Sequence, residues 1–298
     1  MSKNTKNLIA AIVTMLLWGS LFPVVKLGFT KFSVETTADI LLFAGIRFTI
    51  CGAAICIFSL IKNKNSYESA GKNIFPILLS GVFAIILHYG FTYSGLEFTE
   101  SSKTALIKQV GAIFYVCFSF IFIKEDKPTL RKFIAALIGF SGIFVLNVEN
   151  GGFNFGIGEI LILCASFCTV FSNVISKKLF KNVLPITATG ISQLFGGVVM
   201  LAIGLAMNGK VIFSFDYSLL IMAYICAASI VSYCLWFEIV KSAELSKLFI
   251  IKFTEPIFAA IFGAVILQEN IFKIQYLIAL ILTSLGIWIS NTKSETVR

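Results

Sequence analysis

Charge is scarce in this sequence. Asp, Glu, Lys and Arg together supply only 13% of the 298 residues, whereas 58% are hydrophobic. A water-soluble domain of this length needs more polar side chains than that to cover its surface. The scarcity of charge therefore excludes a soluble globular protein, and the short polar connections leave no room for a soluble catalytic domain.

Histidine is almost absent, and the common catalytic patterns are missing with it. His88 is the only histidine. No H-E-x-x-H pattern occurs, and no aspartates cluster along the chain. We therefore predict that the protein is not an enzyme, and we expect neither a metal nor a cofactor.

The seven cysteines fall inside apolar segments rather than in polar loops. Cys164 and Cys168 share a helical face, but no third thiol or histidine accompanies them, as a zinc site requires. We interpret the cysteines as small apolar packing groups, which excludes a disulfide framework.

Long apolar runs make up most of the chain. Ten of them are close to the roughly 20 residues that cross the hydrocarbon core of a bilayer. They predict an all-α polytopic membrane protein with ten transmembrane helices. The first run lacks an A-x-A-like cleavage site, so we interpret it as a retained helix. The predicted spans are Leu8–Phe29, Ala38–Ile61, Ile74–Tyr93, Thr104–Ile123, Phe133–Val148, Gly156–Leu179, Pro185–Met207, Ser218–Val240, Leu248–Leu267 and Ile271–Ser290.

The net charge of +9 resembles that of a nucleic-acid-binding protein, but its distribution indicates another cause. With both termini on the cytoplasmic side, Lys31, Lys103, Lys210 and Lys273 fall outside, and all other loop and terminal cations fall inside. This bias is the positive-inside rule of membrane insertion. It predicts a multi-pass protein of a bacterial-type inner membrane with cytoplasmic N- and C-termini, and no nucleic-acid partner.

The chain resembles itself at an offset of 144 residues. Residues 89–147 align without a gap on residues 233–291, and an offset of 146 places the first two spans on the sixth and seventh. We therefore predict two repeats, residues 1–150 and 151–298, of five helices each. Because five is odd, the second repeat enters the membrane in the opposite sense, an architecture typical of secondary transporters. Matched polar residues include Tyr89/Tyr233, Glu100/Glu244, Lys103/Lys247, Lys108/Lys252 and Glu125/Glu269.

Four cations lie within predicted spans, where a charge costs roughly 3 kcal/mol unless it meets water or a partner. Lys26 is near a helix end, and we expect it to extend to the lipid headgroups. Arg47 lies deep in the second span and needs a carboxylate, helix-end carbonyls or a solute. Lys108 has no acidic residue at helical spacing, so it pairs across the bundle or faces a cavity. Lys252 either pairs with Glu255 or lines the same cavity.

Prolines interrupt two of the predicted spans. Pro256 directly follows Glu255, and in a helix interior it would leave the carbonyl of Lys252 free. Such polar backbone is tolerated in a membrane where it lines a cavity. We predict hinges at Pro256 and, in the first span, at Pro23.

Several aromatic residues are further candidates for the cavity wall. Tyr89 and Tyr233 match across the repeat, Trp236 shares a helical face with Tyr233, and Trp18 lies mid-membrane. For His88, a satisfied interior side chain and a proton carrier both remain open. The predicted solute-binding residues are Trp18, Arg47, His88, Tyr89, Lys108, Tyr233, Trp236, Lys252 and Glu255.

Several stretches resemble the EamA family of the drug/metabolite transporter superfamily. They are "LLWGSLFPVVK", "GIRFTICGAA", "GEILILCASFCTVFSNVISKK" and "SYCLWFEIVKSAELSKLFIIKFTEPIFAAIFGAVILQE". The resemblance implies ten helices in two repeats and the export, or less often import, of amino acids and other small metabolites. The fourth span has no proline where the family often has one, so we expect no matching kink in the first half.

The leading hypothesis is a secondary transporter that moves small carboxylate-bearing solutes by alternating access, with protons as a candidate coupling ion. The same bundle also suits a channel or a translocator of lipid or other solutes. Substrate saturation and counterflow distinguish a carrier from a pore.

Overall fold

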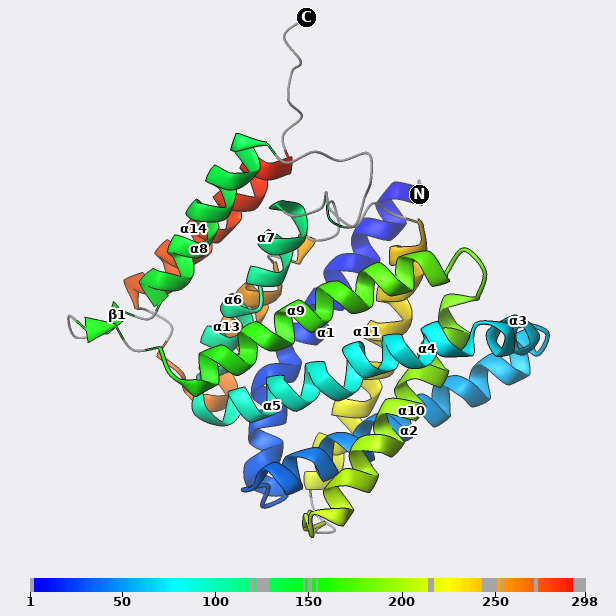
Figure 1. Cartoon of the computed structure of the whole chain (residues 1–298). Helices are drawn as coiled ribbons and strands as arrows, with labels where there is room; N and C mark the ends of the chain where they lie inside the picture. Colours follow the sequence, from blue (N-terminus) through cyan, green and yellow to red (C-terminus); the bar gives the residue numbers. More distant parts are fainter. Residues whose placement is uncertain are drawn as a thin grey trace, which may run out of the picture.

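A computed structural model describes the long apolar runs as helices (Figure 1). It describes residues 3–117, 121, 129–146, 148–149, 152–153, 155–213, 217–242, 251–252, 254–270 and 273–291. Within them, six helices are long and apolar enough to cross a membrane. They are α1 (Lys3–Lys31), α2 (Thr37–Asn63), the continuous run α4–η1–α5 (Ile74–Gly81, Val82–Leu87, His88–Phe98), α9 (Ile157–Leu179), α10 (Pro185–Ala206) and α11 (Ser218–Ser242).

The other predicted spans correspond to shorter helices. Parts of the fourth and ninth spans, including residues 118–120 and 248–250, lie outside the described residues, as do Lys247 and the repeat partners Glu125 and Glu244. Two strands of two residues each pair as a short β-hairpin, so the described structure is not entirely helical as predicted. The remaining elements are α3 (Ser66–Lys72), α6 (Ser101–Ile107), α7 (Val110–Cys117), α8 (Leu130–Leu146), β1 (Val148–Glu149), β2 (Gly152–Phe153), α13 (Thr254–Leu267) and α14 (Ile274–Asn291).

Local sequence signals set several helix starts. Thr36 and Asp39 form a capping box at the start of α2, in which each side chain bonds the backbone of the other residue. Glu159 accepts the Gly156 N–H at 2.9 Å before α9, and Pro185 occupies the first position of α10, where no N–H is needed. These caps satisfy backbone donors that lipid cannot satisfy.

Glycines allow α2 and α10 to pack with their backbones in contact. A Cβ atom at Gly45 would collide with the backbone of Leu201, one at Gly52 with that of Leu194, and one at Gly197 with that of Thr49. Small residues are typical of close helix packing in membranes, where association depends on van der Waals contact. The paired helices lie side by side at the lower right of Figure 1.

A second helix pair lies apart from this one. α8 and α14 pack together at the left of Figure 1, and a Cβ at Gly286 would collide with the backbone of Ala135 and Gly139. Between the two pairs, α1 packs on α11 and α13, whereas α9 packs on α4–α5 and α7. This central group of helices encloses the candidate site.

The fourth span is broken although it contains no proline. α6 ends at Ile107, Lys108 and Gln109 form a turn, and α7 begins at Val110. Gly111 lies against the carbonyl of Ser166 on α9, where a side chain would not fit. The prediction that the first half has no kink is therefore wrong. The break contains no proline and coincides with close packing against α9.

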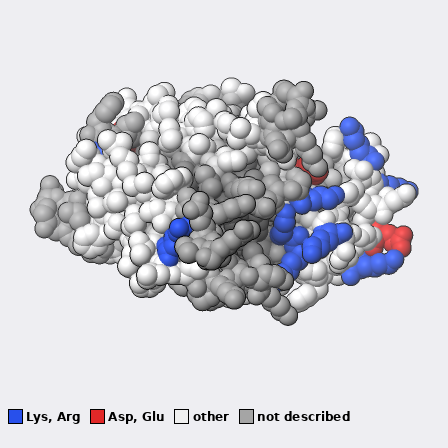
Figure 2. Space-filling view, turned by 90° about the horizontal axis from the view of Figure 1, so that it is seen from above, with Lys and Arg blue, Asp and Glu red and all other residues white. Residues whose placement is uncertain are grey.

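Lysines gather at one end of the helix bundle. The C-terminal ends of α2, α9 and α11 and the short helix α3 lie there. In the view from above (Figure 2), Lys and Arg side chains cluster at the right-hand side of the face. At this end Lys177 Nζ donates to the Val240 carbonyl at 2.8 Å, and Ser69 Oγ donates to the Asn182 carbonyl at 2.5 Å. The cations here, all predicted to be cytoplasmic, are Lys62, Lys64, Lys72, Lys177, Lys178, Lys181 and Lys241.

The glycine contact between α2 and α10 predicts a sharp difference between substitutions. Gly52→Ala and Gly197→Ala should lower the free energy of unfolding by about 1–3 kcal/mol, because the added methyl groups overpack the interface. Gly71→Ala is the matched control, since nothing lies within 4 Å of its added Cβ. It should be neutral or stabilise helix α3 by about 0.5–1 kcal/mol. Thermal unfolding in detergent measures all three, and equal melting temperatures for them would contradict this packing.

Candidate functional site

One cavity of about 60 Å³ lies among α1, α2, α5, α9, α11 and the start of α13. Each of the nine side chains that the sequence predicted for solute binding lines it. The two predicted hinge prolines do not line it. The nine residues are Trp18, Arg47, His88, Tyr89, Lys108, Tyr233, Trp236, Lys252 and Glu255.

Tyr89 and Tyr233, which match across the repeat, meet at the centre. The Tyr233 hydroxyl donates to the Tyr89 hydroxyl at 3.0 Å. Both side chains are buried, and the Tyr89 ring packs 4.3 Å from that of Phe48, centroid to centroid. In an arrangement with a two-fold axis, equivalent residues contact each other only on the axis.

Arg47 is 1% exposed and contacts the cavity without a carboxylate partner among the described residues. Its Nε and Nη2 donate to Ser229 Oγ on α11 at 3.0 and 2.6 Å. Its Cζ lies 4.7, 5.3 and 5.8 Å from the ring centroids of Phe48, Tyr89 and Tyr93, distances that allow cation–π attraction. These contacts position the guanidinium but leave its charge unneutralised.

Lys108 lies in the turn between α6 and α7 and contacts His88. Its Nζ is 3.3 Å from His88 Nε2 and 4.8 Å from the centre of the Phe22 ring. His88 Nδ1 lies 3.0 Å from the Ala165 carbonyl oxygen and 2.9 Å from Thr169 Oγ1. Because a carbonyl only accepts, Nδ1 carries the proton, and Nε2 accepts an N–H from the ammonium. His88 is thus a satisfied interior side chain that orients Lys108.

Lys252 also lies at a helix break, in the turn before α13. Its Nζ is 5.4 Å from the centre of the Trp18 ring and 5.5 Å from that of Trp236. Glu255, three residues on, is 2% exposed, and no ion pair within 4.0 Å joins it to a cation among the described residues. The predicted close Lys252–Glu255 pair is therefore not formed, although both side chains line the same cavity.

Polar residues that the sequence analysis did not select complete the wall. Thr169, Ser172 and Asn173 come from α9, and Asn173 Oδ1 accepts the Trp236 indole N–H at 2.9 Å. Their i, i+3, i+4 spacing marks one helical face and was the available signal. It was weak, because small polar residues also occur at ordinary helix contacts in membranes.

Four buried polar atoms around the cavity have no hydrogen-bond partner in the described part of the chain. They are Trp18 Nε1, Arg47 Nη1, Thr92 Oγ1 and Tyr93 OH. Buried polar groups are otherwise almost always paired. Six further unpaired atoms, on Thr49, Ser101, Gln109, Thr189 and Gln193, lie outside this cavity. The four atoms at the cavity are available to bind a solute.

Pro23 and Pro256 both lie within described helices. Helix α1 continues through Pro23, and Pro256 lies in the first turn of α13, where the lost N–H breaks no helical bond. The Lys252 carbonyl, predicted to be free, accepts the Glu255 N–H at 3.0 Å. The prediction of a free Lys252 carbonyl is therefore wrong, whereas the hinge roles of the two prolines stay predictions.

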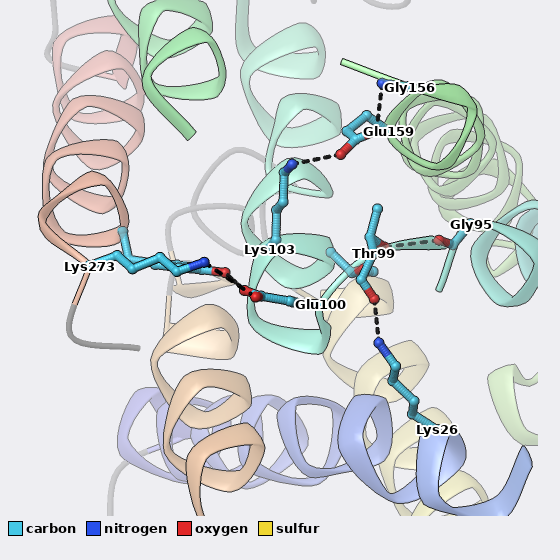
Figure 3. A network of polar contacts seen from close by, with 10 residues as sticks. Lys26, Gly95, Thr99, Glu100, Lys103, Gly156, Glu159 and Lys273 are labelled. Atoms are coloured by element: carbon cyan, nitrogen blue, oxygen red, sulfur yellow. Dashed lines mark hydrogen bonds and ion pairs between the residues drawn. The ribbon is translucent and has the colours of Figure 1, made fainter. Parts of the chain in front are cut away.

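A polar network joins helix ends at one side of the cavity (Figure 3). Lys103 pairs with Glu159 at 2.6 Å, and Lys273 pairs with Glu100 at 3.3 Å. Lys26 donates to the Thr99 carbonyl at 2.6 Å, so its predicted extension to the headgroups is wrong.

Glu269 reinforces this network at the start of α6. Its carboxylate accepts the backbone N–H groups of Ser101 and Ser102 at 2.7 and 3.1 Å and the Ser102 hydroxyl at 2.5 Å. The contact ties the end of α13 to the start of α6, which belong to different predicted repeats.

The site contains no evident metal centre. Among the residues that the structure describes, no three His, Cys, Asp or Glu side chains come together as metal ligands. The chemistry available at the cavity is therefore that of charge, hydrogen bonding and aromatic contact.

Known proteins share both the sequence pattern and the fold. The chain is 26% identical to "Uncharacterized transporter YvbV" of Bacillus subtilis, over 98% of this chain and 93% of that protein. It is 27% identical to "WAT1-related protein At3g02690, chloroplastic" of Arabidopsis thaliana, over 83% and 62% of the two chains. A crystal structure with 16% identity superimposes with a TM-score of 0.70 over 96% of each chain.

A family model extends this similarity over nearly the whole sequence. The model of the EamA-like transporter family matches residues 5–148 and 156–292. The match confirms the resemblance noted from the sequence. The chain belongs to the EamA-like transporter family.

Proposed function

We propose that the protein is a secondary transporter that carries small carboxylate-bearing solutes, such as amino acids or organic acids, by alternating access through the central cavity. Membership of the EamA-like family and the names of its relatives support a membrane transporter rather than an enzyme. The observation that carries the proposal is the convergence of Arg47, Lys108 and Lys252 on one cavity that also holds unpaired polar atoms.

The proposed architecture is ten spans in two inverted repeats, residues 1–150 and 151–298. Two separate matches to the family model support this division. So does the contact between Tyr89 and Tyr233, which are 144 residues apart, and so do the breaks at Lys108 and Lys252, which are equally separated. Broken helices near the middle of the membrane are typical binding elements of transporters with repeats.

The proposed solute carries a carboxylate because its binding wall is cationic. Transfer of a buried cation into hydrocarbon is costly unless an opposite charge or water accompanies it. Arginine also binds carboxylates in a geometry that directs two N–H donors at one group. Export is the direction that the family resemblance favours, and Lys108 with His88 is the candidate for a coupled proton.

The network around Glu269 and Lys103 supports a closed outer end in this conformation. It joins α1, α6, α9 and α13 through ion pairs and helix-end contacts, on the side that the charge bias assigns to the exterior. In alternating access these contacts break when the cavity opens outward.

A screen followed by transport assays tests the carrier function. Amino acids and organic acids are tested for thermal stabilisation of the purified protein, since a bound solute raises apparent stability. The best stabiliser is then used for counterflow in proteoliposomes. Lys108→Ala and Lys252→Ala should each lower transport by about tenfold or more, because a hydrogen bond to a charged group is lost.

The control is Lys72→Ala, which removes an equal charge from an exposed position. It should transport as the unchanged protein does. Linear flux without saturation or counterflow would instead favour a channel or another translocator, and equal transport in all three variants would remove the lysines from the binding site.

Opposite orientation of the repeats is tested with a matched pair of exposed lysines. Lys64 and Lys210 are 146 residues apart and follow the second and seventh predicted spans. In whole cells, an impermeant thiol reagent should label Lys210→Cys, while Lys64→Cys should react only after permeabilisation. Labelling of both from the same side would contradict an inverted repeat.

A further inference from the structure

The cavity holds more positive charge than its own residues neutralise. The only carboxylate among its described lining residues is Glu255, so the three cations that line the cavity face one carboxylate. Arg47 and Lys108 have no carboxylate within 4.0 Å among the described residues. Two cations are thus left for a solute to neutralise.

These two cations contact different neighbours in the cavity wall. Arg47 Cζ is 5.3 Å from the centre of the Tyr89 ring, and Lys108 Nζ is 3.3 Å from His88 Nε2. The Tyr89 and His88 rings stand edge to face with their centres 4.7 Å apart. Because Arg47 and Lys108 lie against different rings, two anionic groups on a short chain can contact both cations.

The hydrogen-bonding capacity of the wall points to the same class of solute. Arg47 Nη1 and Trp18 Nε1 are unpaired and can only donate, and Thr92 Oγ1 and Tyr93 OH are unpaired hydroxyls. The Lys108 ammonium keeps donors beyond the one used by His88 Nε2. The wall therefore complements a solute rich in acceptors, and Glu255 is the one described lining residue with a negative charge for an ammonium group.

The volume favours a small molecule. The cavity of about 60 Å³ is several times the roughly 10–15 Å³ that one water requires on the same measure. A solute with a few carbon atoms between its charged ends is consistent with this size, and a long one is not.

We infer, resting on the proposed transport function, that the solute is a short dicarboxylate dianion with one carboxylate at Arg47 and the other at Lys108. This narrows the carboxylate class to organic acids without an ammonium group. Ser229 and three aromatic rings hold the Arg47 guanidinium in one place. Arg47 therefore selects a solute both by the negative charge of its carboxylate and by the position of that carboxylate.

A pair of nearly isosteric ligands tests the need for two charges. Isothermal titration of the full-length purified protein compares succinate with succinamate, its monoamide, which has one charge fewer. Succinate should bind about tenfold tighter or more, because the amide loses one charge-assisted hydrogen bond. Inorganic phosphate and alanine are titrated as single-group and zwitterionic probes, and both should bind more weakly than succinate.

Variants that remove one positive charge show which cations bind the two carboxylates. Arg47→Gln and Lys108→Gln should each weaken succinate binding about tenfold and reduce the preference for succinate over succinamate. Arg47→Lys keeps the charge and should retain part of that preference, which guards against a variant that fails to fold. Lys72→Gln, on the exposed face of α3, should change neither ligand's affinity.

Three outcomes would overturn the dicarboxylate inference. They are equal binding of succinate and succinamate, tighter binding of alanine or phosphate, and no binding of succinate. If alanine or another amino acid instead shows saturable counterflow, the carrier function stands and only the dianion falls. If every probe passes linearly without counterflow, the carrier function itself falls.

Discussion

The structure depends on how a membrane protein satisfies charge that it buries. Arg47 is 1% exposed and Lys252 8% exposed, so both cations are buried. Hydrocarbon offers such groups no polar partner, so aromatic rings, hydroxyl groups or a bound solute must stabilise their charge. Aromatic faces and Ser229 hold the Arg47 guanidinium in place, and no carboxylate among the described residues lies within 4.0 Å of it. Its position is therefore preorganised while its charge stays available.

The cations also mark where the helices are broken. Lys108 and Lys252 each occupy a turn at a helix end, and each projects onto an aromatic ring of the first helix, Phe22 or Trp18. The α2–α10 and α8–α14 pairs pack through glycines and flank these broken elements. Rigid outer pairs around interrupted inner helices form a scaffold in which the inner elements can move relative to each other.

Much of the cavity was predictable from the sequence because an intramembrane charge is rare and therefore informative. Arg47, Lys108 and Lys252 stood out for that reason, and the internal repeat added Tyr89 and Tyr233. All of them line the cavity. Asn173 and Thr169 were missed, since a small polar side chain in a membrane helix has many ordinary uses.

The errors share a physical cause, which is that tertiary contacts decide local backbone geometry. No residue of the fourth span signals the break at Lys108, which instead accompanies the contact of Gly111 with α9. Pro256 looked like a mid-helix kink because the predicted span began before it, yet it lies in the first turn of α13. Lys26 found a carbonyl of α5 rather than a headgroup, a partner that only the folded bundle provides.

The claim that buried cations hold the solute's charged ends is tested most directly by locating a heavy-atom analogue in a crystal. Crystals soaked with bromosuccinate should show an anomalous bromine peak inside the cavity, between Arg47 and Lys108, and the peak should vanish in crystals of Arg47→Gln. A bromine peak confined to the protein surface, or one inside the cavity that persists unchanged without the guanidinium, would contradict the account.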